Sequence, residues 1–396
     1  MLAAVLAGTD RLTVEEVPTP EPGPGEVLVR VGANTVCGTD VRILRGEKTS
    51  GVRLPVVLGH ETAGHVAAVG AGIDGYEVGA PVAMAPAIPC LHCWECRHDL
   101  ENMCANLRIM GYAVDGGMAD YMLVPAEAIA AGCLFVAETD LPSEQLALTE
   151  PLACVVRGQR WSRVETGDTV LVMGAGPIGL LHLQLALVSG ARQVIVSQPA
   201  GPRQEQAVRL GATAVVDPGR DDLAVAVRDL THGRGADLGI VCVGVPALVN
   251  QAVELSRNAG RVCIFAGMKD KGWADVSANL IHYKQVVLSG SSNCTRADYE
   301  LALDLIVSGR IATDVLVTHR FPLAQVLDAI GTVGDQGAVK AAVVPSLTGQ
   351  ATPGARGGMD ERGGTLRCTP PESLSRLEQR NHNPRVGGSS PSSGIP

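Results

Sequence analysis

The fold of this chain is decided by the run Thr169-Val170-Leu171-Val172-Met173-Gly174-Ala175-Gly176-Pro177-Ile178-Gly179. A short apolar strand, a glycine-rich turn and the start of a helix follow one another here. In this setting the G-x-G-x-x-G pattern indicates a dinucleotide-binding turn. The first glycine permits the tight turn, the second lets the backbone approach a pyrophosphate, and the third allows the helix to pack closely on the strand. The free N–H groups at the helix start would hold the phosphates. The predicted cofactor-binding residues of the turn are Gly174, Gly176, Pro177, Ile178 and Gly179.

Short apolar strands alternate with helical stretches from about Thr166 onward. Strand–helix alternation of this kind predicts a parallel, doubly wound α/β sheet of the Rossmann type. The helices are expected to reach Ser189 and Leu210. The expected strands are 169–173, 193–197, 214–216, 238–243 and 261–266. We place this dinucleotide-binding domain at residues 156–291.

The residue that would meet the adenine ribose stands at the end of the second strand. An acidic residue about 20 positions after the glycine turn usually binds the ribose hydroxyls of NAD. Gln198 occupies this place, and Arg203 follows closely enough to meet a 2′-phosphate, although it could equally be a solvated residue at a helix start. A neutral amide hydrogen-bonds a hydroxyl without repelling a phosphate. The sequence therefore leaves NAD and NADP both open as cofactors.

The residues before the Rossmann-type segment read as strands separated by turns. The run 26–31 alternates like a half-buried strand, and Pro and Gly recur at short intervals as far as Pro89. This pattern predicts a mainly antiparallel, barrel-like catalytic domain over residues 1–155. We expect the chain to return to that domain at 292–346.

The last part of the chain has a different composition. Residues 347–396 are rich in Gly, Ser, Pro, Thr and Arg and show no apolar periodicity. Such a segment has too little apolar surface to offset the entropy lost on ordering. We therefore predict a disordered tail.

A metal site is predicted by four closely spaced cysteines, Cys90, Cys93, Cys96 and Cys104. Such short, regular gaps let successive sulfurs turn onto one ion, as in a tetrahedral all-thiolate zinc site. Disulfides between neighbours this close rarely satisfy the bridge geometry. We predict a structural zinc lobe at about 88–106. Because a closed site leaves no position for a substrate, the chemistry must lie elsewhere.

Two further motifs precede the zinc lobe and a third follows it: Cys37-Gly38-Thr39-Asp40, Gly59-His60-Glu61 and Glu150-Pro151-Leu152-Ala153. Together with the glycine turn and the four cysteines, they resemble the zinc-dependent medium-chain dehydrogenase family over residues 1 to about 346. The third motif is similar to the polyol (sorbitol) and threonine dehydrogenase branch. The resemblance implies a GroES-like catalytic domain beside the Rossmann domain and about two zinc ions per chain. It also implies transfer of hydride between a secondary alcohol, a polyol or sugar-derived alcohol, and NAD or NADP.

The resemblance further implies a catalytic zinc held by Cys37, His60 and either Glu61 or Glu150. A zinc ion with three protein ligands keeps a position open and acts as a Lewis acid. It lowers the pKa of a bound alcohol, so that the alkoxide can give up hydride to the nicotinamide. Both glutamates stay open as the third ligand.

Three residues near Cys37 bear on proton transfer. By resemblance, Thr39 would accept the proton of the substrate hydroxyl, and Asp40 would orient His60 from behind. Asp40 could instead be a turn-forming residue. Arg42 stands where many polyol-type relatives carry a histidine, and an arginine cannot shuttle a proton at neutral pH. The relay would then run through the cofactor ribose or water.

Composition limits the partners. A net charge of −9 and an aromatic content of 3% argue against nucleic acid and anionic membranes. Eleven cysteines without a secretory signal point to a reducing compartment, so we expect a cytoplasmic protein. We further expect a small-molecule alcohol substrate and a homodimer or homotetramer.

Two alternative functions remain. A threonine-type 3-hydroxy amino acid dehydrogenase would need a cation for the substrate carboxylate, and Arg42 could supply it. A non-catalytic nicotinamide-binding redox sensor would use the same fold. Its weakness is that the chain keeps Cys37, His60, Glu61 and Glu150, since a sensor has no need of an open zinc site.

Overall fold

The computed structural model describes residues 1–268, 272–348 and 352–353. These residues fall in one compact unit, Met1–Ala355. Most of the tail expected at 347–396 therefore lies outside the described residues. Within it, Thr352–Pro353 forms a short strand that pairs with 319–320.

The largest sheet is mainly antiparallel and belongs to the two chain segments that we expected to share a domain. Its strands are β3 (Val27–Thr35), β5 (Glu61–Val69), β6 (Pro81–Met84), β9 (Tyr121–Val124), β10 (Leu134–Val136), β17 (Val317–Phe321), β18 (Lys340–Val343) and β19 (Thr352–Pro353). The order is β10-β6-β5-β3-β18-β17-β19, with β9 also paired to β3. Only β17 and β18 run parallel to each other. The predicted strand 26–31 coincides with the first part of β3 from Val27 onward.

Smaller elements complete this part of the chain. A three-stranded sheet contains β1 (Leu2–Gly8), β2 (Arg11–Glu16) and β4 (Val56–Val57), and a two-stranded one contains β7 (Ala87–Ile88) and β8 (Arg108–Ile109). The short helices are α1 (Gly38–Leu44), α2 (Ala126–Ala130), α3 (Ser143–Leu146) and α11 (Val326–Gly331). Single turns of 3₁₀-helix lie at Cys96–His98, Glu101–Met103 and Leu323–Gln325. The four-cysteine segment lies between β7 and β8.

The second large sheet is parallel, which confirms the predicted Rossmann-type fold. Its strands, in spatial order, are β13 (Ala214–Val216), β12 (Gln193–Ser197), β11 (Thr169–Met173), β14 (Ala236–Val241), β15 (Ser256–Ile264) and β16 (Val287–Gly290). The helices are α5 (Pro177–Val188), α6 (Pro202–Arg209), α7 (Leu223–Leu230), α8 (Ala247–Leu255) and α9 (Ala278–Lys284). We predicted strands at 238–243 and 261–266 from their apolar residues. β14 and β15 each end two residues earlier than that, at Val241 and Ile264. Pairing with the neighbouring strands, not apolarity, decides where they stop.

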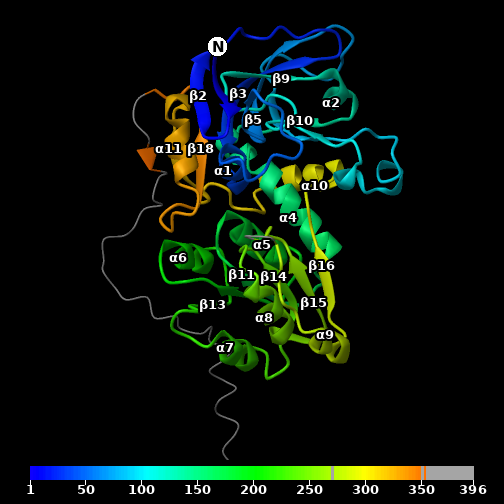
Figure 1. Ribbon diagram of the computed structural model, residues 1–396, viewed down its shortest axis with the longest axis vertical. Coiled ribbons are helices and arrows are strands. Elements are labelled where there is room, and N and C mark those ends of the chain that lie inside the picture. Colours follow the sequence, from blue (N-terminus) through cyan, green and yellow to red (C-terminus); the bar gives the residue numbers. More distant parts are fainter. Residues whose placement is uncertain (269–271, 349–351, 354–396) are drawn as a thin grey trace, which may run out of the picture. The chain divides into compact units, whose positions relative to one another are not determined.

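Two helices link the sheets, α4 (Thr149–Trp161) and α10 (Arg296–Val307), which pack against each other (Figure 1). α4 continues across residues 155 and 156, where we placed the domain boundary. Its buried Leu152 and Val156 belong to one hydrophobic cluster with Val29 of β3 and Val170 of β11. The two sheets therefore share a continuous core.

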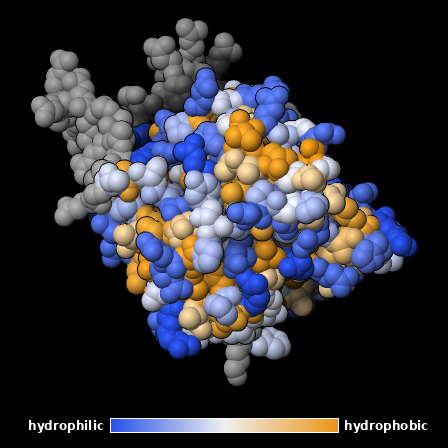
Figure 2. Space-filling view, turned by 90° about the horizontal axis from the view of Figure 1, so that it is seen from above, coloured by the Kyte–Doolittle hydropathy of each residue, from blue (hydrophilic) through white to orange (hydrophobic). Residues whose placement is uncertain are grey.

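The surface seen in Figure 2 carries hydrophobic residues in several groups separated by hydrophilic ones. None of the helices in the described ranges has the length and apolarity needed to cross a membrane.

Candidate functional site

The cysteine and histidine predicted to bind zinc come together where β3 ends and β5 begins. Cys37 follows β3 and is the N-cap residue of α1, while His60 directly precedes β5. The antiparallel register pairs Thr35 with Glu61 and so brings the two strand ends side by side. One ligand atom each from Cys37, His60 and Glu61 lies within 4.8 Å of the other two. A thiolate, an imidazole and a carboxylate at this spacing form a donor set that suits zinc.

Asp40 lies behind His60, as expected for a residue that orients a metal ligand. It is fully buried on α1, and its Oδ1 is 3.2 Å from His60 Nδ1. Its Oδ2 accepts a hydrogen bond of 2.9 Å from the backbone N–H of Cys37. Because Asp40 faces Nδ1, the other ring nitrogen of His60 would be the one free for zinc. The ring of Tyr112 packs edge-on against His60, with 5.2 Å between centroids.

Glu61 has a partner that sequence reasoning missed. Lys340, at the start of β18, is buried with it, and its Nζ lies 2.6 Å from Oε2 and 2.8 Å from Oε1. Thr35 Oγ1 also donates to Glu61 Oε2. The only signal in the sequence was a lysine at the head of an apolar strand. This pair neutralises Glu61, so zinc would have to compete with a buried lysine for that carboxylate.

Glu150 lies in the first turn of α4 and has a different environment. Its Oε1 accepts a weak hydrogen bond of 3.6 Å from Cys154 Sγ. Burial raises the pKa of Glu150 to about 7, against the opposing effect of His60. Glu150 lies outside the compact set formed by Cys37, His60 and Glu61. The structure thus leaves both glutamates available as a third ligand.

Thr39 and Arg42 also lie on α1. Thr39 is half-buried, two residues after Cys37, and Gly38 between them is exposed. Cys37 is likewise half-buried, so solvent reaches the donor set from this side. Arg42 is exposed and lies beside Gly267 at the end of β15, since a Cβ on that glycine would be 3.7 Å from the guanidinium.

The four cysteines of the predicted zinc lobe converge on one point. Their sulfurs lie within 4.8 Å of one another, and Cys93 Sγ is 3.7 Å from Cys104 Sγ. Tetrahedral zinc with Zn–S bonds of about 2.3 Å requires sulfurs about 3.8 Å apart. Hydrogen bonds from the backbone lower the pKa of Cys90 to about 5, whereas burial raises that of Cys96 to about 12. Four thiolates this close need a cation, and zinc fits.

The zinc lobe is bound to the segment that leads into α10. Arg296 donates to Glu101 through its backbone N–H, at 2.6 Å, and through its guanidinium, at 2.8 Å. Asn102 Nδ2 donates to the carbonyl of Ser292, and Asn293 Nδ2 donates to the carbonyl of Asn102. The lobe therefore contacts the chain where it leaves the parallel sheet.

The glycine turn has the geometry expected of a pyrophosphate site. Gly174 has φ of +102°, in the left-handed region that favours glycine. A Cβ on Gly179 would lie 1.8 Å from the carbonyl of Gly174, so only glycine lets α5 pack this closely. At Gly176 a Cβ would meet only the guanidinium of Arg203, at 3.9 Å. The turn therefore leaves space for a ligand over its second glycine.

Gln198 and Arg203 lie at this turn, but both are engaged by protein groups. Gln198 Oε1 accepts a hydrogen bond of 2.8 Å from the N–H of Ala175, and its Nε2 donates to Gln336 Oε1 at 3.3 Å. Arg203 donates to the carbonyls of Asp335 and Ala338, at 2.6 and 2.8 Å. The loop 335–338 thus meets the cofactor side of the parallel sheet. No sequence signal marked it.

Comparison with known proteins now places the chain. Residues 23–132 match the alcohol dehydrogenase GroES-like domain, and residues 177–308 match the zinc-binding dehydrogenase family. An L-threonine 3-dehydrogenase of Pyrococcus horikoshii is 35% identical over 77% of this chain and 87% of its own length. The chain belongs to the zinc-dependent medium-chain dehydrogenases. A D-arabitol-phosphate dehydrogenase of Enterococcus avium is 31% identical over 84% of this chain and 94% of its own length.

A solved structure agrees with this family membership. It is a putative zinc-binding dehydrogenase from Sinorhizobium meliloti bound to NADP, with a TM-score of 0.82 and 34% sequence identity. The match covers 87% of this chain and 99% of that one. As a medium-chain dehydrogenase, this chain is a zinc-dependent oxidoreductase that acts on an alcohol with NAD or NADP.

Proposed function

We propose that this dehydrogenase oxidises the secondary hydroxyl of a polyol or sugar-derived alcohol at Cys37 and His60. The observation that carries the proposal is that Cys37 and His60 come together beside Glu61, with a second carboxylate, Glu150, interacting with His60. Three unlike donors with room for a further ligand are typical of catalytic zinc, whereas four thiolates are typical of structural zinc. The D-arabitol-phosphate dehydrogenase among the relatives supports a polyol-type substrate.

Each residue of the site has a separate role in the proposed reaction. Zinc held by Cys37, His60 and a glutamate would polarise the substrate hydroxyl and lower its pKa. Thr39 Oγ1 would accept the hydroxyl proton and pass it toward water or the cofactor ribose. Asp40 keeps the His60 ring oriented. Arg42 does not relay the proton, because a guanidinium does not give up its proton at neutral pH.

For the third ligand we favour Glu150. Glu61 forms an ion pair with the buried ammonium of Lys340. If Glu61 bound zinc instead, the charge of Lys340 would be left buried without a partner. Glu150 has no cationic partner within ion-pair distance in the described ranges. A carboxylate without a competing cation can take up zinc at lower cost.

The threonine-type alternative keeps specific support. The Pyrococcus horikoshii relative, an L-threonine 3-dehydrogenase, is more similar to this chain than the arabitol-phosphate enzyme. The redox-sensor alternative is not supported, because the named relatives are dehydrogenases. Turnover of L-threonine must therefore be measured beside that of the polyols.

Metal analysis and turnover of matched variants test the proposal. The full chain should hold about two zinc ions and reduce NAD or NADP with a polyol. Cys37→Ser should lose one zinc ion and all turnover while keeping its melting temperature. The control variant Cys263→Ser changes a buried cysteine of the parallel sheet and should keep both zinc ions and its turnover. A single zinc ion that persists in Cys37→Ser would refute the two-site assignment.

Three coarser proposals accompany this one. We propose a catalytic domain of 1–155 and 292–346 around a dinucleotide domain of 156–291, which domain dissection can test.

We propose a homodimer or homotetramer, because β16 is an edge strand that exposes Val287. Light scattering would measure the oligomeric state. We propose a cytoplasmic location, since none of the ten cysteines in the described ranges forms a disulfide.

A further inference from the structure

Two cations next to the candidate active site are not used by the mechanism above. Arg42 lies in the last turn of α1, and Lys48 follows it closely in the chain. The backbone N–H of Lys48 donates to the carbonyl of Arg42 at 3.1 Å, so a tight turn holds the two residues together. Burial and the charge of Arg42 both lower the pKa of Lys48. Their positive charges thus lie close enough to affect each other.

This cationic pair lies next to His60. Lys48 Nζ is 5.3 Å from the centroid of the Tyr112 ring, and the His60 ring packs edge-on against the same tyrosine, with 5.2 Å between centroids. Lys48 and the predicted zinc ligand His60 therefore contact the same aromatic ring. Arg42 lies beside Gly267, just after β15. Substrates and cofactors of such sheets bind at the carboxyl ends of the strands, which is where this glycine lies.

In the described part of the chain, neither cation has an acidic partner. Arg42 and Lys48 form no ion pair there, and the one polar contact of the Lys48 ammonium is the carbonyl of Ser50, at 3.4 Å. The buried Lys340, by contrast, is neutralised by Glu61, and Arg296 pairs with Glu101. Two adjacent cations without an acid repel each other, and an anionic ligand would relieve that repulsion.

We propose that Arg42 and Lys48 bind a phosphate group of the substrate, so that this dehydrogenase acts on a phosphorylated polyol. The inference rests on the function proposed above. A phosphate monoester carries nearly two negative charges and three strong acceptor oxygens, which matches two neighbouring cations. A carboxylate, as in threonine, carries a single negative charge, so it balances two cations less completely than a phosphate does.

Kinetics on a matched pair of substrates test this inference, namely D-arabitol and a terminal D-arabitol phosphate, with L-threonine as a third arm. In the wild type we expect kcat/KM at least tenfold higher for the phosphate than for the neutral polyol. Lys48→Ala and Arg42→Ala should each lower kcat/KM for the phosphate at least tenfold, mainly through KM. Turnover of the neutral polyol should change less than threefold, and KM for the nicotinamide cofactor should stay unchanged.

Controls separate recognition from general effects. Lys48→Arg should restore most of the preference, because it keeps the charge. Arg45→Ala removes an exposed charge from the end of the same helix and should leave the preference intact. Melting temperatures of all variants should stay close to that of the wild type, and calorimetry should show weaker binding of the polyol phosphate to Lys48→Ala.

Several results would overturn the inference. Equal losses on the neutral and phosphorylated substrates would show that the pair is not an anion site. A raised KM for the cofactor in Arg42→Ala would assign that residue to the cofactor instead. A wild type that prefers D-arabitol would refute the phosphate while leaving the polyol function standing. Efficient turnover of L-threonine, lost in Lys48→Ala, would replace the phosphate by a carboxylate. No turnover of any alcohol would refute the proposed function itself.

Discussion

At the scale of single residues, the buried charges of the site are arranged in pairs. Asp40 faces His60, and Lys340 faces Glu61. Removing one member of a buried pair leaves the other without compensation in a medium of low dielectric, which costs more than the pair contributes. The pair of Lys340 and Glu61 is therefore a good place to measure how the strands that carry the site are held.

Replacing Lys340 with Met should destabilise the protein by about 3 kcal/mol, because the carboxylate of Glu61 is left buried without a cation. The double variant Glu61→Gln, Lys340→Met removes both charges and should recover most of that loss. Denaturant unfolding of the wild type, both single variants and the double variant measures the coupling. A loss below about 1 kcal/mol in Lys340→Met would mean that Glu61 takes up a proton or another partner instead.

A negative charge at position 198 should change the choice of cofactor. Gln198→Glu keeps an oxygen for the N–H of Ala175 and adds a negative charge beside the ribose position. That charge would repel the 2′-phosphate of NADP, so we expect the ratio of kcat/KM to shift toward NAD by roughly tenfold, about 1.4 kcal/mol. Gln336→Ala removes the other partner of Gln198 without adding charge and serves as the control. If both variants leave the ratio unchanged, Gln198 has no role in the ribose pocket.

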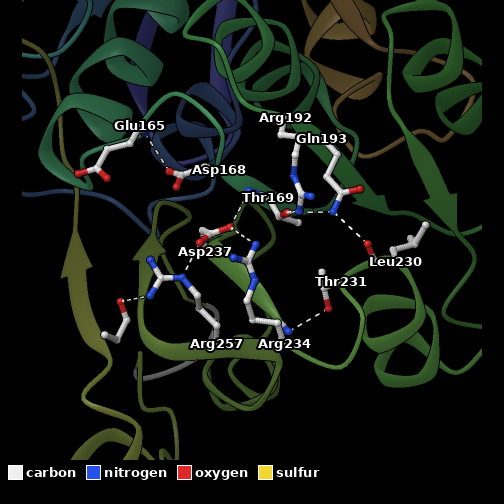
Figure 3. A network of polar contacts seen from close by, with 12 residues as sticks. Glu165, Asp168, Thr169, Arg192, Gln193, Leu230, Thr231, Arg234, Asp237 and Arg257 are labelled. Carbon is white, nitrogen blue, oxygen red and sulfur yellow. Dashed lines mark hydrogen bonds and ion pairs between the residues drawn. The ribbon is translucent and has the colours of Figure 1, made fainter. Parts of the chain in front are cut away.

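At the scale of elements, a polar network joins the N-terminal ends of neighbouring strands of the parallel sheet (Figure 3). The glycine turn lies at the opposite ends of these strands. Asp237 of β14 is its centre. Its Oδ2 accepts the backbone N–H of Thr169, the first residue of β11, at 2.8 Å. Arg257 of β15 and Arg234 pair with the same carboxylate. One buried side chain thus ties together three central elements of the sheet.

Stability should depend on the ionisation of Asp237. Burial alone would raise its pKa, but hydrogen bonds from Arg257 and Thr169 and the charge of Arg234 lower it below the ordinary 3.8. Because this pKa is lower in the folded than in the unfolded protein, the ionised carboxylate stabilises the fold at pH values above the unfolded-state pKa. That contribution is lost as the pH falls through the folded-state pKa. We expect Asp237→Asn to lose about 2 kcal/mol at neutral pH.

Denaturant unfolding of the wild type and of Asp237→Asn between pH 7 and 3 measures this effect. The difference between the two proteins should narrow as the pH falls below about 4, because the unfolded chain takes up the proton at a higher pH than the folded protein does. A difference that stays constant over the whole range would show that charge is not what Asp237 contributes.

At the scale of the whole molecule, one continuous hydrophobic core extends from the antiparallel sheet into the parallel one. α4 supplies the connection through Leu152 and Val156, and α10 packs against it. The zinc lobe is attached to the same region through Glu101 and Arg296. The candidate zinc site and the glycine turn therefore belong to one compact unit rather than to independently folded parts.

Deleting residues 356–396 should leave turnover unchanged and the melting temperature within about 2 °C of the full chain. The composition of this segment offers little apolar surface to offset its ordering entropy. Deletion from residue 349 would also remove the short strand Thr352–Pro353 that pairs with β17, and it serves as the comparison. A large fall in melting temperature on the shorter deletion would show that the segment packs against the rest of the protein.

Much of this architecture is readable in the sequence because its signals are local. The strand, glycine turn and helix of 169–189 lie within one continuous stretch, and backbone sterics alone make glycine necessary at Gly174 and Gly179. The four cysteines of the zinc lobe are likewise close in the chain. Local spacing therefore sufficed to predict the parallel sheet and to propose the lobe.

The rest depends on contacts between distant parts of the chain. Lys340 meets Glu61 across 279 residues, and Gln198 meets Gln336 across 138. No periodicity or spacing encodes such pairs, because strand register and helix packing decide which side chains share a buried space. The sequence by itself determined which chemistry the chain carries, since donor types and glycine turns are local properties. Only the tertiary structure decided which charges neutralise one another and, among the residues that it describes, left Arg42 and Lys48 without an acid.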